Sequence, residues 1–144
     1  MIAVDTNLLV YAHRLDSAWQ QRACAVVTEL AEGRSPWALP WPCLHEFLAI
    51  VTHPRIYSPP SRLADAMRQV DSWLTSPAVV LLAEGDEHWR TLREQLERAQ
   101  ITGPQVHDAR VATLCLQHGV REIWTADRDF ARFGALRSRN PLVD

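Results

Sequence analysis

The feature that most constrains this sequence is a short apolar run that stops at an acid. Residues 2–4 are too few for a buried helix and suit a buried strand, and Asp5, Thr6 and Asn7 follow them before a new apolar segment begins. Ligands of open parallel α/β sheets bind beyond the carboxyl ends of the strands. An acid in this position is therefore either a ligand or, like many aspartates that follow strands, a helix cap.

Short apolar segments and helical segments alternate along the rest of the chain. Strand-like runs recur at residues 37–39, 79–82 and 121–125, and helical periodicity separates them. This alternation predicts βαβ units, and hence a parallel sheet with helices on both faces. In such a sheet Asp5 and Asp127 follow strands that can be neighbours at the switch point, the place where the order of the strands reverses. The expected helices span residues 8–12, 17–32, 42–52, 61–74, 89–99 and 105–117.

Local signals predict how several helices begin, end and pack. Ser17 has the spacing of a capping box, and Ser61 is expected to cap the helix that follows it. Gly33 predicts a left-handed helix end. Met67 and Trp89 fall on apolar stripes, which predicts that both side chains are buried.

Length and charge limit the classes of protein that the chain can be. A length of 144 residues, with no repeat or linker, predicts a single domain over residues 1–144. The net charge of −2 means that any contact with nucleic acid must be local. All 15 cationic residues are arginine, which excludes a P-loop lysine and a Schiff-base lysine. Arginine side chains suit phosphate recognition, because the planar guanidinium binds two oxygens at once.

The cysteines and the amino terminus indicate the compartment. Cys24, Cys43 and Cys115 lie far apart among apolar residues and form no C-x-x-C pair, so we expect reduced core residues. No charged segment precedes a long apolar stretch, and no apolar run approaches ~18 residues. The expectation is a cytoplasmic protein with no membrane segment.

Four acids are expected at the carboxyl edge of the sheet. Asp5 and Asp127 follow strands, whereas Glu46 and Asp108 lie on helices that begin at the same edge. Each has a simpler alternative, such as a helix cap for Asp5 or Asp127, a favourable dipole position for Asp108, or a solvated side chain for Glu46. Together, however, the four carboxylates would repel one another unless a cation neutralised them. Oxygen ligands without His or Cys favour Mg²⁺ or Mn²⁺ over zinc.

These residues lie in four segments of the sequence, which are Val4-Asp5-Thr6-Asn7, His45-Glu46-Phe47, Val106-His107-Asp108-Ala109 and Trp124-Thr125-Ala126-Asp127-Arg128-Asp129-Phe130. In these segments the chain resembles the PIN-domain ribonucleases, and specifically the VapC toxins of bacterial VapBC toxin-antitoxin pairs. The resemblance covers essentially the whole chain, because the four segments occur in the family's order and spacing.

The resemblance implies a PIN-like three-layer α/β/α sandwich with a central parallel sheet. It further implies a Mg²⁺-dependent endoribonuclease toxin, with Mn²⁺ as a substitute ion, that cleaves RNA, forms a homodimer and is inhibited by a VapB-type antitoxin. By the family's pattern, the catalytic and metal-binding residues are Asp5, Glu46, Asp108 and Asp127.

Two points stay open at the level of sequence. By the same resemblance, Thr6, Asn7 or Thr125 would orient the acids through hydrogen bonds, whereas Asp129 could either support the metal site or cap the turn before Phe130. The alternatives for function are an RNA-processing or decay PIN nuclease without an antitoxin, and a catalytically silent PIN binding module. The presence of all four acids argues against the silent module.

Overall fold

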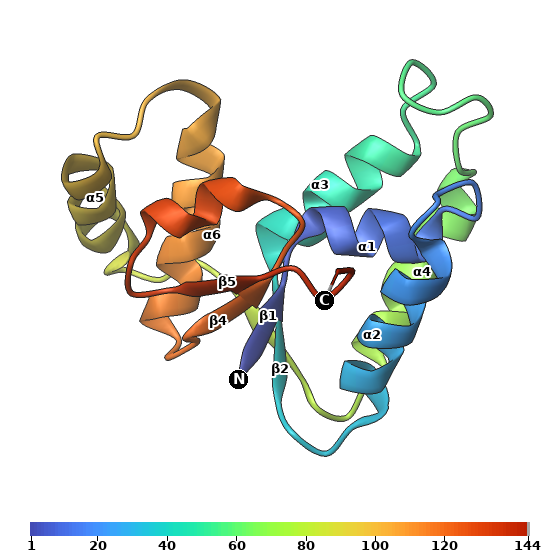
Figure 1. Cartoon of the computed structure of the whole chain (residues 1–144), viewed down its shortest axis with the longest axis horizontal. Helices are drawn as coiled ribbons and strands as arrows, with labels where there is room; N and C mark the ends of the chain where they lie inside the picture. The colour runs from blue at the N-terminus through green and yellow to red at the C-terminus, as the bar shows by residue number, and fades with distance from the viewer. Residues whose placement is uncertain (144) are drawn as a thin grey trace.

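A single parallel sheet organises the chain. The computed structural model describes residues 1–143, and its five strands are all parallel in the order β3-β2-β1-β4-β5 (Figure 1). The chain moves outward in one direction from β1 and then returns to the other side of it, so the switch point lies between β1 and β4. The strands are β1 (Ile2–Val4), β2 (Trp37–Pro40), β3 (Val79–Leu82), β4 (Glu122–Trp124) and β5 (Arg137–Arg139).

Helices cover both faces of the sheet, which confirms the predicted three-layer α/β/α sandwich. Helices α1 to α4 lie on one side, and α5, α6 and the 3₁₀ helix η2 lie on the other (Figure 1). Across residues 1–143, none of the helices combines the length and the apolar character that crossing a lipid bilayer requires. The helices are α1 (Thr6–His13), α2 (Gln20–Glu32), α3 (Trp41–Val51), α4 (Leu63–Leu74), α5 (His88–Ala99), η1 (Gly103–Gln105), α6 (Val106–Gln117) and η2 (Arg128–Arg132).

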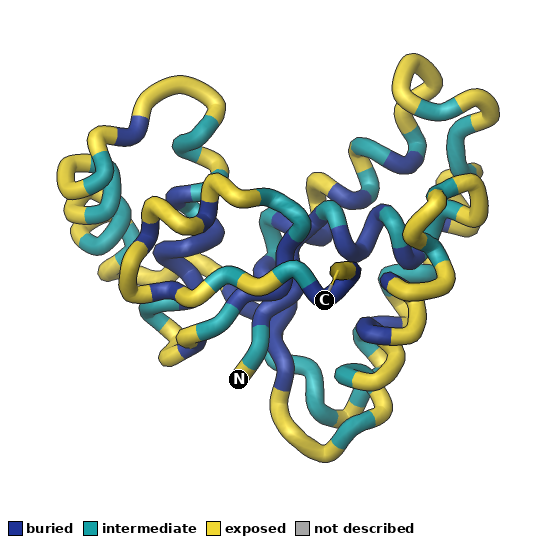
Figure 2. The backbone as a smooth tube through the Cα atoms, in the orientation of Figure 1, coloured by how far each residue is buried: buried dark blue, intermediate teal, exposed yellow. Residues whose placement is uncertain are grey.

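The core lies around the central strands, where β2 is buried throughout and β1 and β4 are buried after their first residue (Figure 2). Strand β1 pairs with β4 so that Val4 lies opposite Trp124. The pairing continues one residue further, because the Asp5 backbone N–H donates to the Trp124 carbonyl at 3.0 Å. This register places Asp5 beside the end of β4, as the sequence predicts for a switch point.

Three predicted helix ends are wrong. Helix α2 begins only at Gln20, and the Ser17 hydroxyl accepts from the Trp19 N–H outside the helix, so there is no capping box. Gly33 has a φ of −73°, which is extended and not left-handed. Arg62, and not Ser61, occupies the N-cap position of α4, because the Ser61 hydroxyl is used in contacts with α1.

Helical periodicity also overestimates burial on the outer helices. Met67 on α4 is 47% exposed and Trp89 on α5 is 63% exposed, although both lie on apolar stripes. Helix α5 contains no buried residue, and its most extensive packing is against α6. Of the cysteines, Cys43 and Cys115 are buried as expected, whereas Cys24 on α2 is exposed.

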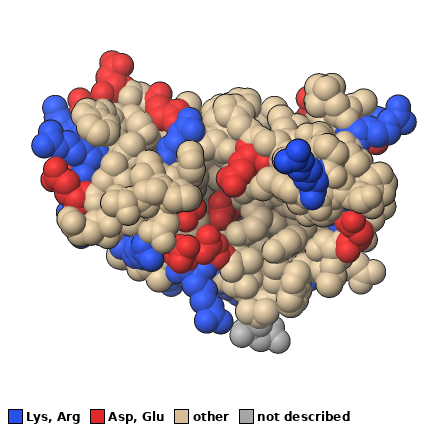
Figure 3. Space-filling view, turned by 90° about the horizontal axis from the view of Figure 1, so that it is seen from above, with Lys and Arg blue, Asp and Glu red and all other residues tan. Residues whose placement is uncertain are grey.

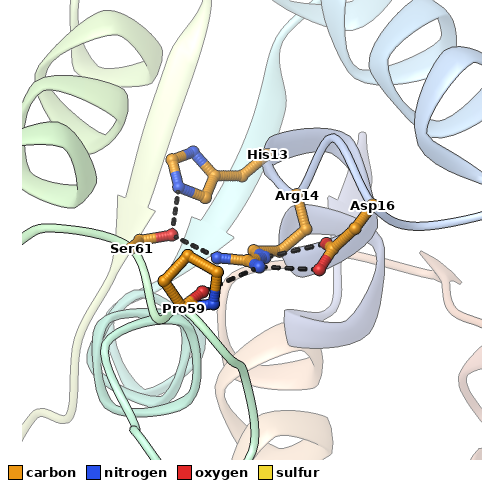
Figure 4. A network of polar contacts seen from close by, with 5 residues as sticks. All are labelled: His13, Arg14, Asp16, Pro59 and Ser61. Carbon is orange, nitrogen blue, oxygen red and sulfur yellow. Dashed lines mark hydrogen bonds and ion pairs between the residues drawn. The ribbon is translucent and has the colours of Figure 1, made fainter.

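A polar network holds the segment after α1 against the α3–α4 connection (Figure 4). The Arg14 guanidinium donates to both Asp16 carboxylate oxygens, to the Ser61 hydroxyl and to the Pro59 carbonyl, at 2.7–3.2 Å. It also lies 4.1 Å from the centroid of the Tyr57 ring. Because α1 and α3 each carry residues of the acidic edge, this network helps to fix their relative position.

Arg14→Ala should therefore destabilise the fold. Arg14 is only 11% exposed and makes several charge-assisted hydrogen bonds, so we expect a loss of about 1–3 kcal/mol in the free energy of unfolding. Urea denaturation measures this loss. Arg68→Ala is the matched control, because the Arg68 side chain is 75% exposed and pairs only with Asp65, three residues earlier. A change within about 0.5 kcal/mol is expected for the control, and equal effects of the two substitutions would contradict the role of the network.

Candidate metal centre

The Asp5 carboxylate is buried at the switch point, and each of its two oxygens accepts two hydrogen bonds. Its Oδ1 accepts from the Thr6 backbone N–H at 2.8 Å and from the Cys43 thiol at 3.6 Å. Its Oδ2 accepts from the Thr125 hydroxyl at 2.8 Å and from the Asn7 side-chain nitrogen at 3.3 Å. Asp5 is thus also the N-cap of α1, so the cap and the functional position predicted from the sequence coincide.

Asn7 and Thr125 form a hydrogen-bonded link between the ends of β1 and β4. The Asn7 amide oxygen accepts from the Ala126 N–H at 3.1 Å, which orients its nitrogen toward Asp5 and Thr125. The Thr125 hydroxyl accepts from the Asp127 N–H at 2.9 Å while it donates to Asp5. The Thr125 hydroxyl thus uses its donor and both of its lone pairs, and Asn7 uses both of its amide hydrogens, in this link.

Glu46 reaches the same edge from α3. The helix begins at Trp41 with Pro42 in its first turn, where the missing N–H of proline costs nothing. Cys43 and Phe47 lie on the buried face of the helix, whereas Glu46 lies on the neighbouring face and is exposed. The Thr6 hydroxyl donates to Glu46 Oε2 at 3.1 Å, which joins Glu46 to the end of β1.

Asp108, Asp127 and Asp129 form the tightest group of acids. One carboxylate oxygen from each lies within 4.8 Å of the others, so the three could hold a single ion. Asp108 is in the first turn of α6, and Asp127 follows β4. The Asp129 N–H donates to Asp127 Oδ1 at 2.8 Å, which makes Asp127 the cap of η2 and folds Asp129 back toward it.

The sequence leaves the part of Asp129 in this group undecided. Its two open roles were support of the site and a cap before Phe130, and the cap proves to be Asp127. The D-x-D spacing of residues 127 and 129 is the signal that could have identified it, because a carboxylate that accepts from the N–H two residues later brings the two acids together.

The electrostatics of these acids reflect burial and mutual repulsion. Burial, together with the negative charges of Asp127 and Asp5, raises the pKa of Asp108 to about 6. Weaker contributions to the same pKa come from Asp129 and Glu46, so four other carboxylates act on Asp108. Burial also raises the pKa of Asp5, against the lowering effect of its bonds from Thr125 and Thr6.

This arrangement fits a hard divalent cation. The group consists of carboxylates alone, with no histidine or thiolate among the three close ligands, and such oxygen sets favour Mg²⁺ or Mn²⁺. Seen from above, Asp and Glu side chains gather around a hollow near the middle of the face (Figure 3). A cation there would remove the repulsion that raises the pKa of Asp108.

Two hollows adjoin the acids. One, of about 360 Å³, lies between α3 and α6 and includes Glu46, His45 and His107 in its wall. The other, of about 240 Å³, lies between the ends of β4 and β5 and includes Asp127, Arg128 and Arg139. A ligand that extends to either side of the acids thus has room to do so.

Comparison with known sequences assigns the family. Residues 2–136 match the PIN domain, which is most of the chain. The chain belongs to the PIN-domain family. Within it, the chain is 36% identical to the ribonuclease VapC43 of Mycobacterium tuberculosis, over 99% of this chain and 96% of the relative. It is 33% identical to the ribonuclease VapC33 of the same species, over 99% of both chains. This PIN domain is therefore a homologue of the VapC ribonucleases.

Solved structures support the fold of this PIN domain. The structure of M. tuberculosis VapC20, described as a sarcin-ricin loop cleaving toxin, aligns over 93% of this chain and 95% of that one with a TM-score of 0.69 and 16% identity. VapBC2 from Rickettsia felis, bound to a promoter DNA fragment, aligns over 97% of this chain and 98% of that one with a TM-score of 0.67 and 20% identity. At these identities the likeness concerns the fold.

The acids should make the metal-free protein sensitive to pH. The pKa of Asp108 is raised from 3.8 to about 6, so between these values the folded protein keeps a proton that the unfolded chain releases. The free energy of unfolding in EDTA should therefore fall as the pH rises from about 4 to about 6. Asp108→Asn should weaken this dependence and stabilise the metal-free protein at pH 7 by about 1 kcal/mol, a value reduced for solvent screening of a partly exposed group.

Thermal and urea unfolding in EDTA across this pH range measure both effects. The control is Asp71→Asn, which removes a charge from the exposed face of α4, away from the site, and should leave the pH dependence unchanged. Lower stability of Asp108→Asn than of the wild type at pH 7 in EDTA would contradict the role of repulsion among the acids.

Proposed function

We propose that this PIN domain is the endoribonuclease toxin of a type II toxin-antitoxin system and hydrolyses RNA phosphodiester bonds at the acidic edge. The observation that carries the proposal is the cluster of Asp108, Asp127 and Asp129 at the switch point, in a chain 36% identical to a VapC ribonuclease. By the same homology, and because solved relatives are VapBC complexes, we propose a VapB-type antitoxin as partner and a homodimer as the assembly.

Within this proposal, Asp5, Glu46, Asp108 and Asp127 are the catalytic and metal-binding residues, and Asp129 is added to them. A bound Mg²⁺, or Mn²⁺ in its place, supplies positive charge to the scissile phosphate and lowers the pKa of a coordinated water. Asp108, Asp127 and Asp129 are close enough to hold one ion together. Glu46 completes the site, either as a ligand or through a bound water.

Asp5 differs from the other acids in the number of hydrogen bonds that its carboxylate already accepts. Four donors already surround its two oxygens, so it accepts a new ligand only by giving up one of these bonds. Its buried charge acts on Asp108 and so contributes to the attraction of a cation. The bonds from Thr125 and Asn7 fix the direction of the carboxylate, and such outer contacts commonly change metal affinity or activity by about 10–100-fold.

Cleavage of RNA by the purified protein tests the proposal. The wild type should cut RNA in Mg²⁺ and stop in EDTA. Asp108→Asn and Asp127→Asn should each lower kcat/KM by at least about 100-fold, because each removes a charge that holds the ion. Asp71→Asn on α4 should keep wild-type activity. Full activity of Asp127→Asn, or cleavage that persists in EDTA, would contradict the assignment.

A further inference from the structure

The hollow of about 240 Å³ beside Asp127 has the composition of an anion site. Its wall is built from the segment after β4 and from the end of β5, and Arg128 and Arg139 are among the residues that line it. Ser138 and Asn140 add polar groups to it. The side-chain oxygen of Asn140 already accepts from the Leu142 N–H at 3.0 Å, so the side-chain nitrogen is the group left to donate to a ligand.

Both arginines are available to a ligand. Each is exposed, and no carboxylate within residues 1–143 lies within 4.0 Å of either guanidinium. The contrast is Arg110, which borders the other hollow but pairs with Glu84 and lowers the pKa of that carboxyl. Arg139 helps to lower the pKa of Glu122 through its charge, but within residues 1–143 neither Arg128 nor Arg139 is held in an ion pair, and both adjoin the acidic centre.

The fold holds Arg139 in place. The Thr125 N–H donates to the Arg139 carbonyl at 2.9 Å, and Arg139 lies opposite Trp124 in the sheet. The Arg139 guanidinium also lies over the Trp124 ring, 5.8 Å from its centroid. An arginine stacked in this way loses less conformational freedom when it binds a phosphate than an unsupported side chain would.

We propose that Arg128, Arg139 and the Asn140 side chain bind a backbone phosphate of the RNA next to the phosphate that is cleaved. This inference rests on the proposed ribonuclease function and adds a second contact to it. The guanidinium fork matches phosphate oxygens, and the volume suits a phosphate with part of its ribose. In a chain with a net charge of −2, such a contact provides the local attraction for RNA that the overall charge lacks.

The double variant Arg128→Ala/Arg139→Ala tests the subsite in steady-state cleavage of a single-stranded RNA oligonucleotide. We expect KM to rise by about tenfold or more, because charge-assisted hydrogen bonds are lost, and kcat to stay within about twofold, because the contact is the same in the ground and transition states. The slope of log kcat/KM against log salt concentration should become shallower by ~0.7, the value for one phosphate contact on a single strand.

Matched variants distinguish phosphate binding from a general loss of positive charge and from damage to the acidic centre. Arg121→Ala removes an exposed arginine just before β4. This residue lies at the amino end of the strand, away from the acids at its carboxyl end, so the substitution should change neither KM nor the salt slope. Arg128→Ala alone, at an exposed position, should give a smaller rise in KM and serves if the double variant fails to fold. Stabilisation of the double variant by Mn²⁺ should equal that of the wild type, because the acids are intact.

The outcomes distinguish the subsite from the function. Wild-type KM and salt slope in the variants, while the wild type cleaves RNA, would overturn the subsite and leave the ribonuclease assignment standing. Loss of Mn²⁺ stabilisation in the variants would also overturn it, since the arginines would then act through the acids. An inactive wild type in Mg²⁺ would overturn the proposed function and the subsite together.

Discussion

The burial of the Asp5 carboxylate at the switch point is the constraint on which the rest of the structure depends. A buried charge is costly unless it is hydrogen-bonded, and here the donors come from α1, α3 and the end of β4. The parallel pairing of β1 with β4 brings the Thr125 hydroxyl to the carboxylate. The strand order, the start of α1 and the position of α3 thus each bring a hydrogen-bond donor to the Asp5 carboxylate.

The same edge accumulates negative charge that the fold does not neutralise. Asp108 has a pKa of about 6 because burial and four neighbouring carboxylates oppose its ionisation. Arg128 and Arg139 are nearby but form no ion pair with described acids. Proteins keep destabilising arrangements of this kind where function needs them. A bound cation would neutralise the acids, and a bound phosphate would neutralise the two arginines.

The sequence predicts the sheet and the positions of the acids well, because both follow from short-range patterns. Alternating strand and helix signals predict a parallel sheet, and Asp5 and Asp127 follow its adjacent strands. The role of Asp129 depends on a turn that the D-x-D spacing of residues 127 and 129 permits but does not by itself specify. The sequence mispredicts Met67 and Trp89, which are exposed. Periodicity identifies the apolar face of a helix but does not show whether another element covers that face. The Arg139 position depends on β4–β5 pairing, which a three-residue strand signals only weakly.

The most direct test of the metal centre is a crystal structure of the protein equilibrated with Mn²⁺, with the ion located from its anomalous scattering. The arrangement of the acids predicts a peak within bonding distance of carboxylate oxygens from Asp108, Asp127 and Asp129, with Asp5 still bonded to Thr125. A saturated crystal with no peak at this edge, or with the ion bound away from Asp108 and Asp127, would contradict the presence of a metal centre here.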